Sequence, residues 1–179
     1  MGPGRVSEAQ LVFSRAVAGD AAELCALLNA VAVDLTRRYG DGHWTRVSTE
    51  KGTLRRIADS HVVVARDSHG RLAGTFELVT KKPWAIDRAC FTPVKRPIYL
   101  INMAVDVSMQ RRGIGRKMLA EAERIARAWP AQSICLDAYD TPAGAGRFYA
   151  RCGYREVGRK VYRGVPLVYY ESLIRPAVD

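Results

Sequence analysis

The feature that most constrains the fold is an apolar segment, a glycine-containing loop and an amphipathic helix that follow one another near the middle of the chain. Residues 98–107 are apolar enough for a buried central strand, and apolar positions recur at helical spacing through residues 114–129. Pro130 ends the helix, and residues 133–138 form a further apolar strand. This strand–helix–strand unit predicts an α/β or α+β fold in which helices pack on a sheet.

The flanking segments extend the same architecture in both directions, without a repeat or an obvious linker. We therefore predict one domain over residues 1–179. Helical spacing, β-branched runs and turn residues predict further strands at 10–17, 61–66, 72–79, 154–162 and 165–173, and helices from Asp20 to Leu35, from Ser48 or Thr49 to Ala58, and from Ala143 to Arg151.

Composition limits the partners that the chain is expected to have. No apolar run approaches the ~20 residues of a membrane helix, and residues 1–8 lack the apolar core of a signal peptide. We therefore expect a cytoplasmic protein without a membrane partner. The net charge of +10 is spread along the chain, and a solvated surface with one phosphate site accounts for it, so no nucleic-acid partner is expected. The cysteines lack the spacing of metal ligands, so we expect no metal and small hydrophobic side chains at Cys25, Cys90, Cys135 and Cys152.

The loop before the long helix reads Gln110-x-x-Gly113-x-Gly115. Glycines let the main chain approach a ligand, and a helix start presents unbonded N–H groups, so a pyrophosphate would fit here. A dinucleotide fingerprint is excluded because Met118 stands at its third glycine, and a P-loop sequence is absent. On these residues alone, a glycine turn beside surface cations is an equal alternative. The cations are Arg111, Arg112, Arg116 and Lys117.

A second motif, Ala145-x-x-Phe148-Tyr149-x-x-x-Gly153-Tyr154, lies on the short helix after the next strand. Alone, it is typical of a core helix with two aromatic residues. In this order and spacing, the two motifs together resemble the GNAT family of N-acetyltransferases. The resemblance implies a mixed, mostly antiparallel twisted sheet with a central β-α-β unit and helices on both faces.

The resemblance also implies acetyl-CoA as the acyl-donor substrate. A bulge would splay the central strand from its parallel neighbour, and the pantetheine arm would lie in the gap. The N–H groups of residues 111–116 would hold the pyrophosphate. The implied cofactor-binding residues are Met103, Ala104, Val105, Gln110, Arg111, Arg112, Gly113, Ile114, Gly115, Arg116 and Lys117.

The expected chemistry requires a base and an acid. An alkyl amine with a pKa of about 10.4 is mostly protonated at neutral pH, so it must lose a proton before it attacks the thioester. The resemblance places Tyr149 near the sulfur, where it could protonate the leaving thiolate at a cost of about 2 kcal/mol. A purely packed tyrosine is the alternative. Glu77 is the candidate base, directly or through a water, and a solvent-facing Glu on an alternating strand is an equal alternative.

The sequence departs from the family pattern at two positions. Some relatives carry a Glu or His base where this chain has Tyr99, so Tyr99 is expected to line the acceptor pocket instead. Relatives often have an Asn that bonds the pantetheine arm where this chain has Thr141-Pro142, and Thr141 is expected to replace it. Asp106 is expected at the bulge, in a structural role.

Three loops would select the amine acceptor. They contain His43 and Trp44, then Trp84, Ile86 and Asp87, and then Tyr162 and Arg163. Each tryptophan is equally compatible with ordinary packing. We predict acetyl transfer to a primary amine of a small molecule or peptide, by a protein that forms a homodimer as many relatives do. The alternative is a non-catalytic acyl-CoA sensor, which would not need a proton donor at the sulfur.

Overall fold

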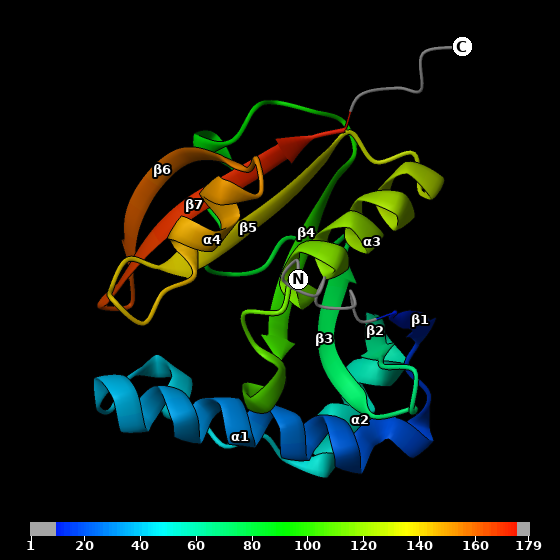
Figure 1. The fold of residues 1–179 in the computed structure, drawn as a ribbon. Coiled ribbons are helices and arrows are strands. Elements are labelled where there is room, and N and C mark those ends of the chain that lie inside the picture. The colour runs from blue at the N-terminus through cyan, green and yellow to red at the C-terminus, as the bar shows by residue number, and fades with distance from the viewer. Residues whose placement is uncertain (1–9, 175–179) are drawn as a thin grey trace, which may run out of the picture.

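The computed structural model describes residues 10–174, which form a seven-stranded sheet with helices on both faces (Figure 1). The strand order is β1-β2-β3-β4-β5-β7-β6, and β4–β5 is the parallel pair among antiparallel neighbours. The strands are β1 (Val12–Arg15), β2 (His61–Arg66), β3 (Leu72–Val79), β4 (Pro97–Val105), β5 (Ser133–Tyr139), β6 (Arg155–Tyr162) and β7 (Val165–Leu173). The α-helices are α1 (Ala21–Tyr39), α2 (Glu50–Asp59), α3 (Ile114–Ala128) and α4 (Gly146–Arg151). This arrangement confirms the predicted fold class.

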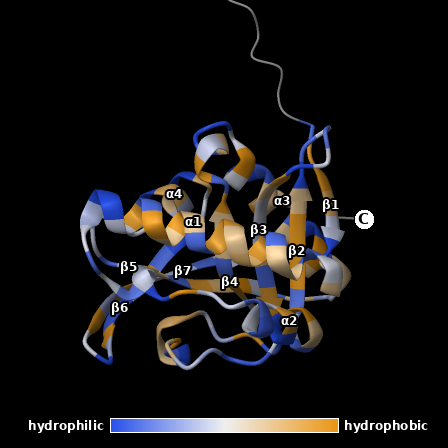
Figure 2. Cartoon of the chain, turned by 90° about the horizontal axis from the view of Figure 1, so that it is seen from below, coloured by the Kyte–Doolittle hydropathy of each residue, from blue (hydrophilic) through white to orange (hydrophobic). Residues whose placement is uncertain are grey.

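The two faces of the sheet are covered by different helices. On one face, the apolar stripe of α3, from Ile114 to Ala126, packs with Tyr149 of α4 against β2 to β5. On the other face, Leu24 and Leu27 of α1 pack against the opposite side of β2. Apolar and polar residues alternate along α1, which crosses the sheet in Figure 2. Within residues 10–174, every helix is too short or too polar to span a bilayer.

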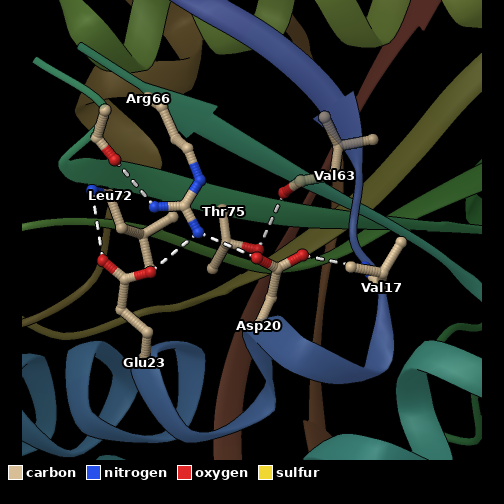
Figure 3. A network of polar contacts seen from close by, with 8 residues as sticks. Val17, Asp20, Glu23, Val63, Arg66, Leu72 and Thr75 are labelled. Carbon is tan, nitrogen blue, oxygen red and sulfur yellow. Dashed lines mark hydrogen bonds and ion pairs between the residues drawn. The ribbon is translucent and has the colours of Figure 1, made fainter.

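A polar network fixes the start of α1 on the β2–β3 hairpin (Figure 3). Arg66 at the end of β2 donates from Nη2 to Asp20 Oδ1 at 2.8 Å and to Glu23 Oε2 at 2.7 Å. Asp20 also accepts from the main-chain N–H of Val17, which closes the turn before the helix. This anchoring matters for the site because α1 continues to Tyr39, beyond the predicted end at Leu35, and its second half lines two cavities.

A bulge in β4 opens the sheet at its centre. β4 and β5 are paired only from Pro97↔Ser133 to Tyr99↔Cys135, and beyond that point the two strands diverge (Figure 1). On the other side of β4, the register with β3 shifts opposite Phe76, where Asn102 adopts φ 51°. Asparagine tolerates this left-handed conformation better than most residues. The family resemblance implied a bulge in this strand, and the structure places it at Asn102.

Asp106 lies outside the bulge, contrary to our expectation. Its side chain instead accepts a hydrogen bond from the N–H of Ser108 at 2.9 Å and closes the turn after β4. Its structural role is therefore in the approach to the glycine loop.

Candidate active site

A groove of about 570 Å³ runs along the splayed half of β4 and over the start of α3. Its walls are α1, β4, the glycine loop and the segment that enters α4. Most of the predicted cofactor-binding residues line it: Met103, Ala104, Val105, Gln110, Arg111, Gly113, Ile114, Gly115 and Arg116. Arg38 and Arg151, which the sequence analysis missed, add two cations to the lining.

The glycine loop has the conformation of an anion cradle. Arg111 at φ 62° and Gly113 at φ 78° are both left-handed, so successive N–H groups turn toward one side. The first helical bond of α3 runs from the N–H of Lys117 to the carbonyl of Gly113. Among the described residues, no main-chain carbonyl accepts from the N–H groups of 111–116. Gln110 fastens the loop to β4 through its amide, which donates to the Val105 carbonyl at 3.2 Å.

Gly115 allows α3 and α4 to approach each other beside this cradle. A Cβ at Gly115 would lie 2.9 Å from Cζ of Phe148, closer than side-chain contacts allow. Phe148 lines the groove next to Tyr149, so the two sequence motifs meet in space.

Tyr149 brings a phenol to the point where β4 and β5 separate. The ring is buried against Phe148, Tyr154 and Tyr170, and its hydroxyl lies 3.9 Å from the sulfur of Met103 on β4. Burial raises the pKa of Tyr149 well above 10, and the charge of Asp137 raises it further. The hydroxyl therefore stays protonated at neutral pH and is available as a donor of a proton or a hydrogen bond.

Asp137 is a functional candidate that the sequence analysis missed. It lies on β5 two positions after Cys135, where pairing with β4 has ended. Its charge raises the pKa of Tyr139 as well as that of Tyr149, which places the carboxylate near both phenols. Burial raises the pKa of Asp137 itself, and within residues 10–174 its carboxylate bonds only its own main chain. The sequence does contain a signal for this candidate, because Asp137 places a carboxylate between Leu136 and Ala138 in an apolar strand.

Glu77 is buried beneath α2 and does not face solvent, so that alternative was wrong. Its carboxylate accepts from Arg56 Nε at 3.0 Å, Ser60 Oγ at 2.6 Å and Asn102 Nδ2 at 2.9 Å. Three donors occupy three of the about four acceptor positions of the carboxylate. The contacts instead tie α2 to the bulge of β4.

A second cavity, of about 640 Å³, lies between α1, α2, the bulge and residues 43–49. It shares Val31, Leu35, Met103 and Ala104 with the first groove, so the two cavities meet along α1 and β4. His43 and Trp44 form one wall by packing on Tyr139 of β5, with ring centroids 6.2 and 5.6 Å away. Arg56 and Asn102 line the cavity between their shared partner Glu77 and the open space.

Several predicted residues lie elsewhere. Trp84 is 85% exposed, and Tyr99 is buried in a cluster with Phe91 and Cys135 on the paired half of β4. Thr141 lines a neighbouring pocket with Tyr139 and Arg159. The structure does not bring these three residues to the two cavities described above, nor does it place Arg112 and Lys117 in the groove lining.

Comparison with known proteins identifies the fold that carries this site. Residues 58–156 match the family model of the acetyltransferase (GNAT) domain. The chain belongs to the GNAT family. This GNAT chain therefore carries an acetyltransferase domain. No curated protein matches its sequence significantly.

Solved GNAT structures share the fold at low sequence identity. A GNAT acetyltransferase of Listeria monocytogenes superposes with a TM-score of 0.71 at 18% identity, covering 91% of this chain and 94% of that one. A Streptococcus pneumoniae GNAT acetyltransferase gives a TM-score of 0.66 at 20% identity, with 92% and 100% covered. The Salmonella typhimurium protein yncA, solved with its cofactor acetyl-CoA, gives 0.68 at 15% identity, with 95% and 97% covered.

Proposed function

We propose that this acetyltransferase moves the acetyl group of acetyl-CoA to a primary amine of a small molecule or peptide by direct attack on the thioester. The observation that carries the proposal is the meeting of the two cavities at Met103 and Ala104, beside the phenol of Tyr149. One cavity suits the acyl donor, and the other gives an acceptor a separate entrance to the same atoms.

The groove along β4 and the start of α3 binds acetyl-CoA and polarises its thioester carbonyl. The N–H groups of residues 111–116 bind the pyrophosphate, and Arg116 adds charge beside it. The unpaired edge of β4, residues 103–105, binds the pantetheine arm, and an N–H near Val105 stabilises charge on the carbonyl oxygen. Acetyl-CoA supplies an activated thioester carbonyl. Further contacts of acetyl-CoA with Thr141, Arg112 and Lys117 remain predictions from the sequence.

Asp137 removes the proton from the incoming ammonium, in place of the predicted base Glu77. A carboxylate with a raised pKa is a better base than an ordinary one, and Asp137 lies at the open end of β5. Glu77 acts as a positioning residue, because its partners Arg56 and Asn102 line the acceptor cavity. His43 and Trp44 shape that cavity.

Tyr149 donates a hydrogen bond to the leaving sulfur. Its raised pKa makes complete proton transfer cost more than the about 2 kcal/mol expected for an ordinary tyrosine. A hydrogen bond to the developing thiolate stabilises the transition state without that full cost.

The test is acetyl-CoA-dependent thiol release across amino acids, polyamines, arylamines, aminoglycosides and peptide N-termini, with wild type and Tyr149→Phe. Turnover that falls about 10²-fold in the variant supports the proposal. Acetyl-CoA binding without turnover of any amine would favour an acyl-CoA sensor instead.

A further inference from the structure

The charged lining of the acceptor cavity is entirely cationic. Among residues 10–174, the charged side chains of its lining are those of Arg46 and Arg56, and none is an Asp or a Glu. A cavity of this kind repels polycations and attracts a substrate that carries an anionic group. The remaining lining is apolar or neutral, contributed largely by α1 and by residues 47–49.

Arg56 presents an unused guanidinium edge. Only its Nε is engaged, by Glu77 at 3.0 Å, and 27% of the side chain is exposed. Within residues 10–174, the two terminal nitrogens of Arg56 have no hydrogen-bond partner. A guanidinium fixed through Nε keeps those two nitrogens oriented for a bidentate contact with a planar anion.

Arg46 supplies a second cation on the opposite loop. It is exposed, and no carboxylate of the described chain pairs with it. Tyr139 of β5 also lines the cavity, and Asp137 stands two positions before Tyr139 on the same strand. The cavity therefore has positive charge on the walls of α2 and the 43–49 loop, and the Asp137 carboxylate lies on the strand that supplies Tyr139.

We infer that the acceptor is a small amine that also carries a carboxylate, that is, an amino acid or a close analogue. This inference rests on the proposed acetyl transfer. Arg56 and Arg46 bind the carboxylate of the acceptor, which directs its amine toward the splay between β4 and β5. The reaction breaks the thioester C–S bond and forms an amide C–N bond. Of the two protons that the ammonium loses, Asp137 takes one, and the other ends on the sulfur of the released CoA.

The inference is tested with matched acceptors that differ only in the carboxylate. Each amino acid is compared with its amide and its methyl ester, by kcat/KM for thiol release. The free carboxylate should be preferred roughly 10- to 100-fold, as expected for hydrogen bonds between charged groups. In parallel, thermal stabilisation of the CoA-bound protein by each compound measures binding without turnover.

Three variants locate the effect. Arg46→Gln and Arg56→Gln should each reduce the preference, whereas Arg55→Gln, an exposed neighbour on α2 outside the cavity, should not. Within residues 10–174, the exposed side chain of Arg46 makes no hydrogen bond or ion pair, so Arg46→Gln separates recognition from folding. Equal turnover of acids, amides and polyamines would overturn the inference while leaving acetyl transfer intact.

The measurement of thermal stabilisation distinguishes this inference from the proposed function. Carboxylate-selective stabilisation that is lost in Arg46→Gln, without turnover of any amine, would support the ligand class and refute acetyl transfer. Absence of both turnover and selective binding would refute both.

Discussion

The side-chain amide of Asn102 donates a hydrogen bond to Glu77 Oε2 at 2.9 Å from the bulge at which β4 turns away from β5. The same carboxylate holds Arg56 and Ser60 at the end of α2. One buried group therefore joins the opening of the sheet to the wall of the acceptor cavity. The geometry of the site depends on a residue that lines neither cavity.

Replacing Glu77 should affect the fold and the rate but not the pH dependence of catalysis. Glu77→Gln removes a buried charge that Arg56 requires, and it should lower the free energy of unfolding by about 2 kcal/mol. Urea unfolding and pH–rate profiles measure the two effects. Loss of the acid limb of the profile would instead identify Glu77 as the base.

Glu171 offers a matched control for that experiment. It is equally buried, and it accepts hydrogen bonds from Thr92 and Arg155 on a different part of the sheet. Glu171→Gln should destabilise the protein similarly while kcat stays close to that of the wild type.

Removing the hydroxyl of Tyr149 should reduce kcat by about 10²-fold with little change in the KM for acetyl-CoA. Within residues 10–174, the hydrogen bond of this hydroxyl goes to the sulfur of Met103 at 3.9 Å, which is a weak acceptor, so Tyr149→Phe should unfold at nearly the wild-type temperature. Tyr154→Phe removes a hydroxyl from an adjacent buried ring, 5.9 Å away between centroids, and should keep full activity. Equal rates for the two variants would contradict the role of Tyr149.

Asp137→Asn should lower the catalytic rate and raise the stability of the folded protein. Loss of the base should lower kcat/KM by roughly 10²- to 10³-fold. Because burial raises the pKa of Asp137 in the folded state, this carboxyl contributes stability that is present below its unfolded pKa and lost as pH rises through the raised folded pKa. The difference in melting temperature between variant and wild type should therefore grow as pH rises from about 4 toward neutrality. A variant that is less stable at neutral pH would contradict this account.

The glycine loop can be tested with a pair of identical substitutions. Gly113 at φ 78° and Gly70 at φ 77° are both left-handed, so alanine should cost each about 1–2 kcal/mol of stability. Only Gly113→Ala disturbs the cradle, and it should raise the Kd for acetyl-CoA roughly tenfold, as for one weakened hydrogen bond to a charged group. Calorimetric titration measures the difference, and equal Kd values would argue against pyrophosphate binding at this loop.

The sequence predicts those features that depend on local pattern. Periodicity placed the strands His61–Arg66 and Leu72–Val79 correctly, and the glycine and tyrosine motifs pointed to one groove. The features that the sequence did not predict depend on the register between strands that are distant in the chain. The bulge lies at Asn102 because β3 and β4 slip there, and a slip is not encoded in the residues of one strand. Tyr99 is in the core because it falls on the paired half of β4.

Loops and buried charges were equally hard to predict. A tryptophan in a loop was expected to line the acceptor pocket, yet the path of the loop leaves the Trp84 ring in solvent. Glu77 and Asp137 both interrupt apolar strands, and only the structure distinguishes the carboxylate with three donors from the one without a side-chain partner in residues 10–174.

The measurement that tests the central claim most directly is the stoichiometry of transfer, followed by mass spectrometry with acetyl-CoA and each amine of the panel. The account predicts that one N-acetylated product forms for each CoA released, and that Tyr149→Phe slows both together. CoA released without an N-acetylated amine, or acetyl-CoA bound and left intact with every amine, would contradict it.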